Sequence, residues 1–287
     1  MKTPQIALAL LMILCASLQV SGDEWESLFD GKTLKGWEGD EKLWSVQDGA
    51  ITGITKDDEP LPYNKFLIAT GLGVVGDFHF KTSFRLEGNN NSGVQYRSAQ
   101  LKDAGEFVVG GYQADIHANP PYTAMLYDER GRGILAQRGQ KVVVAKDGKV
   151  TVVEQQKEVA AVELSKWHTL EVIAIGAKII HRLDGEVAIE ISDYDEKDRE
   201  LEGIIALQVH RGPAMKVQFK DMVIKVLDKK DETNGDVGAV PNWIWPEDAP
   251  AETTVVFSKE FNVPGNRVGG VRLSGTADNS YEFSVNG

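Results

Sequence analysis

Polar side chains able to bind a ligand or move a proton recur two positions apart in three segments of the sequence. They are Gln95 and Arg97, then Gln113, Asp115 and His117, then Gln208 and His210. The residues between them are apolar or aromatic, so a period of two would place each polar set on one face of a strand. Asp115 or His210 could act as a general base there. Planar amide and guanidinium groups suit the dense hydroxyls of a sugar.

Each of these residues also has a purely structural interpretation. The set could be a solvated sheet face, Asp115 could simply pair with Arg97, and His210 could be a satisfied strand histidine. His117, just before Ala-Asn-Pro-Pro, could only cap the end of a strand, and Asn91 lies first of all in a turn. An ordinary solvent-exposed sheet face of an acidic protein, however, carries mostly Lys, Glu, Thr and Ser. The amide-, Arg- and His-rich composition therefore favours the floor of a binding site, with Asn91 at its edge.

Strand patterns dominate the sequence from residue 25 to residue 227. Alternation predicts strands over 77–88 and 92–98, three strands over 168–192 with turns at Gly176-Ala177 and Asp184-Gly185, and a last hairpin across Gly212-Pro213. One or two helical turns are expected over 154–164. Trp37 and Trp44 are expected in the core, and His79, His168 and His181 are expected to be structural. Many short antiparallel strands predict an all-β sandwich of two sheets.

Composition restricts the partners of this protein. The chain has 287 residues and a formal net charge of −12. A surplus of carboxylates disfavours binding to nucleic acid or to an anionic membrane, because both are negatively charged and bind patches of Lys and Arg. The apolar run in residues 1–22 predicts a cleaved export signal, so we expect a secreted or periplasmic protein without a membrane anchor. The mature chain would then contain no cysteine.

Three further segments follow the predicted signal. Residues 23–228 carry the sandwich pattern, and residues 229–241 form a polar, glycine-containing linker. Residues 242–287 begin a second β pattern that is too short to bury a core alone. We therefore expect a partial second β-domain, with further C-terminal domains beyond this chain.

The sequence offers little support for a cofactor. It contains no HxH, HExxH or CxxC spacing, no glycine-rich phosphate loop and no G-x-S-x-G motif. The acidic run at 193–198 lacks the pattern of a calcium-binding EF-hand. No cofactor is predicted, and recruitment of a divalent metal stays an open alternative.

Several motifs in order along the chain resemble the 3-keto-disaccharide hydrolase family. They are LFDGKTLKGW, LWSVQDGAITG, NSGVQYRS, GYQADI, LYDERGRGIL, IIHRLDGEV and IALQVHRGPAMKVQFKDMVI, within residues 25–227. The resemblance implies an exported protein with a concanavalin-A-like lectin/glucanase sandwich. The segment from Asn242 resembles the start of a galactose-binding-like domain. Glucanases of this fold carry E-x-D-x-x-E, of which only Asp115 remains here, so cleavage by two carboxylates is not expected.

The resemblance implies a substrate with a ketone at C3 of the sugar. Such a ketone acidifies the C2 hydrogen, so one base, donors to the enolate and an acid for the leaving group suffice. The candidate catalytic residues are Asp115, His210 and Arg97. The candidate substrate-binding residues are Gln95, Gln113, Gln208, Tyr127, Glu129, Arg132 and Asn91. A non-catalytic carbohydrate-binding module and a metal-dependent glucanase-like hydrolase are the alternatives.

Overall fold

The structure, a computed structural model, describes residues 24–227. The predicted export signal, the linker and the second β-domain lie outside the described residues.

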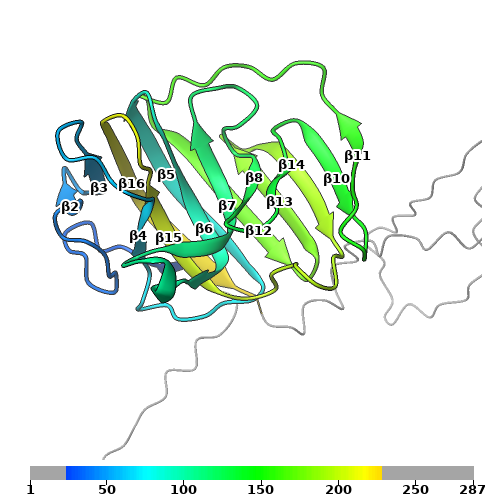
Figure 1. Cartoon of the computed structure of the whole chain (residues 1–287), viewed down its shortest axis with the longest axis horizontal. Coiled ribbons are helices and arrows are strands. Elements are labelled where there is room, and N and C mark those ends of the chain that lie inside the picture. Colours follow the sequence, from blue (N-terminus) through cyan, green and yellow to red (C-terminus); the bar gives the residue numbers. More distant parts are fainter. Residues whose placement is uncertain (1–23, 228–287) are drawn as a thin grey trace, which may run out of the picture. The chain divides into compact units, whose positions relative to one another are not determined.

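Most of the described strands belong to a ten-stranded sheet (Figure 1). In spatial order its strands are β11 (Val150–Gln155), β10 (Gln140–Val144), β14 (Glu186–Asp193), β13 (Lys178–Leu183), β12 (His168–Ile175), β5 (Phe78–Gly88), β16 (Met215–Val226), β3 (Ala50–Thr55) and β2 (Trp44–Gln47), with β1 (Glu26–Ser27) paired to β16. Neighbouring strands run antiparallel, except for the parallel pair β10 and β14.

A six-stranded antiparallel sheet forms the second layer. In spatial order its strands are β4 (Lys65–Ile68), β15 (Ile204–Val209), β6 (Asn91–Gln100), β7 (Val109–His117), β8 (Leu126–Glu129) and β9 (Gly133–Ala136). The prediction of an all-β, two-sheet sandwich is therefore confirmed.

The core fills the space between the sheets because apolar residues alternate along the strands. On β5, Phe80 and Phe84 are fully buried, whereas Lys81 between them is exposed. Val94 of β6 and Ala114 of β7 belong to the same core cluster. Burying an aromatic side chain of this size stabilises the fold by roughly 1.5–3 kcal/mol, so the inner faces of both sheets hold the layers together.

A few polar side chains in this core have partners. The Tyr96 hydroxyl lies 2.7 Å from Nε2 of His181, whose Nδ1 lies 3.1 Å from the carbonyl oxygen of Ala124. Burial lowers the pKa of His181 to about 4. His181 is therefore a neutral structural residue, as the sequence predicted. Trp37 and Trp44 are also buried, as expected.

Turn chemistry accounts for the hairpins of β12, β13 and β14. Asp184 and Gly185 both have positive φ, 51° and 84°, which is the backbone that a two-residue hairpin turn of this hand requires. Gly176, in the preceding turn, has φ 51°. The three predicted strands and both turns are found where the sequence placed them.

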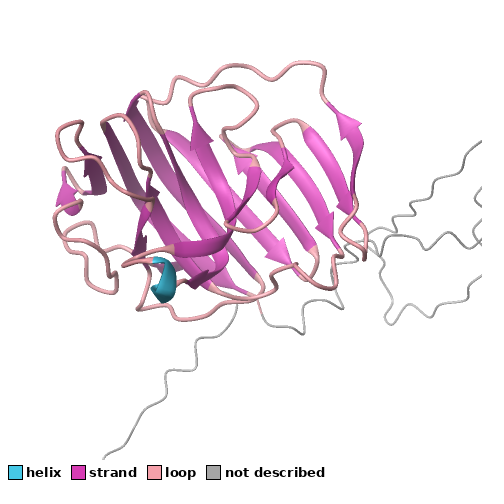
Figure 2. Cartoon of the chain, in the orientation of Figure 1, coloured by secondary structure: helices cyan, strands magenta, loops and turns pink. Residues whose placement is uncertain are grey.

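Two predictions about the elements are wrong. Residues 154–164, where helical turns were expected, form no helix: the first two end strand β11, and the described helical structure is the short 3-10 helix η1 (Lys102–Ala104) (Figure 2). Strands β15 and β16 do not form a hairpin, because β15 pairs with β4 and β6 while β16 pairs with β3 and β5. The chain crosses from one sheet to the other at residues 210–214. A turn motif alone does not distinguish a hairpin from such a crossing.

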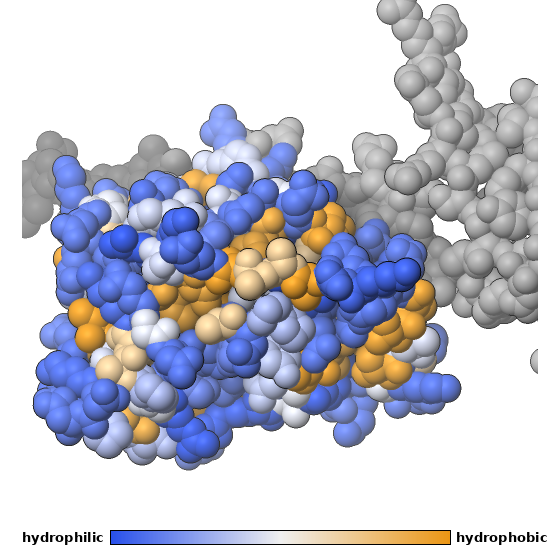
Figure 3. Space-filling view, turned by 90° about the horizontal axis from the view of Figure 1, so that it is seen from above, coloured by the Kyte–Doolittle hydropathy of each residue, from blue (hydrophilic) through white to orange (hydrophobic). Residues whose placement is uncertain are grey.

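The face of the described residues seen in Figure 3 is mainly hydrophilic, with hydrophobic residues between the polar ones. Edge strand β11 exposes Val150, Val152 and Val153 by 44%, 47% and 48%. None of the helical structure within residues 24–227 is long and apolar enough to cross a bilayer.

Candidate functional site

A pocket of about 560 Å³ lies on the face of the six-stranded sheet that carries the polar residues of β7. Ala114 and Ile116 of this strand point into the core, whereas Gln113, Asp115 and His117 line the pocket. The period-two interpretation of β7 thus holds. The complete lining is Tyr63, Asn64, Asn91, Gln113, Asp115, His117, Tyr122, Met125, Tyr127, Glu129, Arg130, Ile134, Gln208, His210 and Arg211.

Gly93 makes room for the floor of this pocket. It faces Asp115 across the β6–β7 ladder. A Cβ at position 93 would lie 2.5 Å from the side chain of Gln113. The Gln113 amide can therefore lie over β6, where it contacts the amide of Gln95 at 3.0 Å.

Asp115 is a buried carboxyl at the pocket wall, only 2% exposed. Nε2 of Gln113 donates to its Oδ1 at 2.8 Å. Burial raises the pKa of Asp115 to about 7, the charge of Glu129 adds to the rise, and the Gln113 hydrogen bond opposes it. A carboxyl with a pKa near neutrality can both accept and release a proton under physiological conditions.

Two histidines line the same pocket. Burial lowers the pKa of His210, with a smaller lowering from the charges of Arg211 and His117, against a hydrogen bond to the Arg211 carbonyl. Burial also lowers the pKa of His117, whose ring meets Tyr122 edge to face at 5.2 Å. Both imidazoles are therefore mainly neutral at pH 7 and can accept a proton.

Two pocket amides have buried atoms without a hydrogen-bond partner among the described residues. They are Gln208, through both Nε2 and Oε1, and Asn91, through Oδ1. Gln208 is fully buried. Because an unsatisfied buried polar atom costs about 1–3 kcal/mol, these groups are suited to bind a ligand that offers both donors and acceptors.

Asn64 connects two sides of the pocket. Its Nδ2 donates to Oε1 of Glu129 at 3.2 Å, and its Oδ1 accepts from the backbone N–H of Arg211 at 3.1 Å. Burial raises the pKa of Glu129, and the Asn64 hydrogen bond opposes the rise. The turn after β8 and the segment between β15 and β16 are thereby held beside each other.

Arg97 does not lie in the pocket, contrary to the sequence-based expectation. The β6–β7 register shifts between Tyr96 and Ser98, and Arg97 has φ 45°, so the alternation of sides is interrupted there. Its guanidinium is buried and bonds Asp77 at 2.8 Å and the carbonyl of Gly176 at 2.7 Å. Arg97 therefore joins the two sheets and does not touch the pocket.

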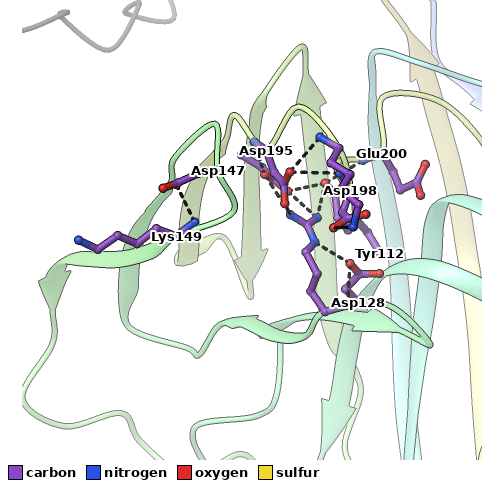
Figure 4. A network of polar contacts seen from close by, with 10 residues as sticks. Tyr112, Asp128, Asp147, Lys149, Asp195, Asp198 and Glu200 are labelled. Carbon is purple, nitrogen blue, oxygen red and sulfur yellow. Dashed lines mark hydrogen bonds and ion pairs between the residues drawn. The ribbon is translucent and has the colours of Figure 1, made fainter.

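Arg132 is also absent from the pocket. Its guanidinium bonds Asp128 at 3.0 Å, Asp193 at 2.7 Å and Asp195 at 3.2 Å, and donates to the Tyr112 hydroxyl at 3.1 Å. Figure 4 shows the carboxylates of Asp128 and Asp195 gathered around this guanidinium. Arg132 therefore anchors the turn between β8 and β9 to the loop after β14.

The other predicted site residues divide into two groups. Gln95 is fully buried beneath the pocket, where the Ser98 hydroxyl also bonds it at 2.7 Å. The remaining predicted residues line the pocket together: Asn91, Gln113, Asp115, Tyr127, Glu129, Gln208 and His210. Their catalytic and binding roles stay predictions.

Several lining residues escaped the sequence-based prediction. His117 continues the alternation of Gln113 and Asp115, so the period of two indicated that it belongs to the site. The alternative interpretation, a cap at the end of the strand, kept it out of the predicted set. Tyr63, Asn64 and Tyr122 lie in irregular segments without periodicity, and Arg130 and Arg211 follow predicted site residues directly. Only adjacency to Glu129 and His210 could have indicated these two arginines.

The described fold resembles several solved structures at low identity. A protein of Parabacteroides distasonis ATCC 8503, provisionally described as a glycosyl hydrolase, is 17% identical over 71% of this chain and 100% of its own, with a TM-score of 0.49. The carbohydrate-binding module CBM66 of Bacillus subtilis is 18% identical over 66% and 95%, with a TM-score of 0.44. The laminarinase catalytic domain of Thermotoga maritima MSB8 is 9% identical over 71% and 97%, with a TM-score of 0.45.

No curated protein sequence matches the chain. A family model does, namely that of the 3-keto-alpha-glucoside-1,2-lyase-like domain, over residues 24–225. The match covers the described sandwich, apart from the last residue of β16, and every residue of the pocket. The chain therefore belongs to the 3-keto-alpha-glucoside-1,2-lyase-like domain family and carries a carbohydrate-active, glycosyl hydrolase-like domain.

Proposed function

We propose that this protein hydrolyses 3-keto-glycosides in two stages within the pocket. A base removes the C2 hydrogen as a proton, and the electrons form an enolate with the C3 ketone. The enolate then expels the glycosidic oxygen from C1, and the departing oxygen takes up a proton. Water adds across the resulting C1–C2 double bond, so that the net reaction is hydrolysis. We further propose that the protein works outside the cytoplasm.

The observation that carries this proposal is the carboxyl of Asp115 in the pocket. It is buried, its pKa is raised to about 7, and its side-chain partner is a neutral amide. A carboxylate with a raised pKa is a stronger base than an ordinary one, which suits removal of a proton from carbon beside a ketone. We assign Asp115 as the base.

The other requirements of the reaction are met by neighbouring groups. Nε2 of Gln208 has no partner within the described residues and could donate to the enolate oxygen. Glu129, whose pKa burial raises, lines the pocket and could supply the proton to the leaving oxygen. His210, which also lines the pocket, could do so only in its protonated form, the minor form at pH 7. Both stay candidates for the acid.

A non-catalytic carbohydrate-binding role is the second candidate. Tyr63, Tyr122 and Tyr127 line the pocket and offer aromatic surface for sugar rings. Together with the unpartnered amides of Gln208 and Asn91, they could hold a saccharide without changing it. This role requires no base, so it predicts that Asp115 can be replaced by Asn without loss of function.

Release of the aglycone from a 3-keto-glucoside separates the two candidates. We expect turnover by the wild type and a loss of about 10²–10⁴-fold in Asp115→Asn, with substrate binding retained. Asp58→Asn, at an exposed position outside the pocket, is the matched control. Absence of turnover in the wild type, or equal rates in wild type and Asp115→Asn, would contradict the proposal.

A further inference from the structure

Within residues 24–227, two arginines at the pocket make no side-chain hydrogen bond or ion pair, although the charge of one of them, Arg130, acts on Glu129. Among the described residues, the side chains of Arg85, Arg97, Arg132, Arg138 and Arg182 each bond a side chain or a backbone carbonyl. For Arg130, Arg199 and Arg211, the structure shows no side-chain hydrogen bond or ion pair. Arg130 and Arg211 both line the pocket.

This lack of partners is not due to a shortage of acids. The chain has 43 Asp and Glu residues against 31 Lys and Arg. A net negative protein repels anionic ligands on average, so an unpaired pair of cations at one pocket creates a local exception. Both arginines are exposed, which leaves their guanidinium groups free to meet a ligand.

Asn64 links the two segments that carry these arginines. Its side chain bonds the carboxyl of Glu129, which precedes Arg130, and the backbone N–H of Arg211 itself. Arg130 itself has φ 61°, a left-handed backbone that non-glycine residues adopt rarely. The turn is further fixed because Asp128 accepts from the Arg132 backbone N–H at 3.2 Å.

From this arrangement we infer that the pocket prefers glycosides that carry an anionic group, such as a carboxylate, outside the reacting sugar, with Arg130 and Arg211 binding that group. The inference rests on the proposed function, since it specifies the substrates of the same pocket. Guanidinium groups suit such oxyanions because their planar donors pair with two oxygens at once.

The other charged and titratable groups of the pocket set the limits of this preference. Asp115 and Glu129 are the lining carboxyls. Burial raises the pKa of Asp115 to about 7, so its carboxyl is partly protonated near neutrality; burial also raises the pKa of Glu129, against the Asn64 hydrogen bond and the charge of Arg130. His117 and His210 have lowered pKa values and are mainly neutral. The two arginines therefore carry the full positive charges of the pocket, and partial protonation of Asp115 weakens its repulsion of an anion beside them.

Two aryl 3-keto-glucosides that differ only in a para carboxylate or a para carboxamide test the inference. For the wild type at low salt, we expect kcat/KM to favour the carboxylate by roughly three- to tenfold, the effect of two partly exposed ion pairs. In the double variant Arg130→Gln/Arg211→Gln, the ratio should fall to about one, whatever the rate on the carboxamide. Arg199→Gln, an arginine without a side-chain hydrogen bond outside the pocket, should keep the ratio.

Calorimetric binding of the same two glucosides without the 3-keto group separates this inference from the proposed function. If neither keto compound is turned over, the proposed function fails, and the binding ratio still decides the inference. Equal affinity for both compounds, no binding of the carboxylate compound, or a carboxylate preference that persists in the double variant would overturn it.

Discussion

Nε2 of Gln113 lies 2.8 Å from Oδ1 of Asp115, two positions further along strand β7. Both side chains lie on the pocket face, because the period of two brings residues 113 and 115 to the same side. The Gln113 amide hydrogen-bonds the carboxyl of Asp115 but carries no positive charge that would pair with it. Asp115 therefore keeps the raised pKa that burial gives it.

The pH dependence of turnover should report the ionisation of Asp115. A base must be deprotonated, so kcat/KM should rise with pH through an apparent pKa near 7, and a fall at higher pH would report the group that must donate a proton to the leaving oxygen. If His210 were the base, the rise would lie below its ordinary value of 6.5, because burial lowers the pKa of His210. Initial rates between pH 5 and 9 distinguish the two assignments.

Asp115 should also lower the stability of the fold at neutral pH. Its pKa is about 7 in the folded state and 3.8 ordinarily, so its contribution is most favourable below pH 3.8 and is lost as the pH rises to 7. The full loss is on the order of 4 kcal/mol. Asp115→Asn should therefore be more stable than wild type at pH 8, with the difference disappearing near pH 4. Urea denaturation at both pH values measures it, and a pH-independent difference would contradict the linkage.

Replacing Gln208 should separate binding from stability. Gln208→Leu removes two buried atoms that lack partners, so the free energy of unfolding should stay equal or rise by about 1 kcal/mol while substrate affinity falls. Gln95→Leu is the matched control, because Gln95 is equally buried and has amide partners. It should destabilise the protein by about 1–3 kcal/mol. Equal effects of the two changes on unfolding would refute this difference.

Arg97 should matter for folding. Arg97→Met leaves the carboxyl of Asp77 without its buried partner and should cost about 3–5 kcal/mol of unfolding free energy. Arg199→Met, which removes a guanidinium without a side-chain hydrogen bond or ion pair among the described residues, should cost less than about 1 kcal/mol. Chemical denaturation gives both values. The folded fraction of Arg97→Met should bind substrate with wild-type affinity. A selective loss of affinity would show instead that Arg97 contributes to the binding site.

The sequence predicted those features that depend on local rules. Alternation located β5, β6 and β7, and the Asp184-Gly185 turn located a hairpin, because period and turn backbone are properties of neighbouring residues. On β7, the same rule selected Gln113 and Asp115 correctly as residues of one face. It failed at Arg97, where one extra residue in the ladder interrupts the alternation.

Features that depend on distant contacts could not be predicted in this way. Arg132 has a side chain of the kind found in saccharide-binding sites, but its partners Asp193 and Asp195 lie about 60 positions away along the sequence. The pairing of β15 with β4 and β6 likewise depends on strands that are far from β15 in the sequence. Tyr63 and Asn64 reach the pocket because β4 pairs with β15, and their own segment has no pattern that indicates this.

The pairing of Phe66 on β4 with Gln208 on β15 joins residues more than a hundred positions apart along the chain. Contacts between residues so far apart in the sequence form slowly, because the chain must lose the entropy of closing a long loop before these contacts can stabilise it. Saccharide affinity should consequently be among the last properties regained during refolding. A stopped-flow experiment would then find hairpin β12–β13 formed well before the protein can hold its ligand.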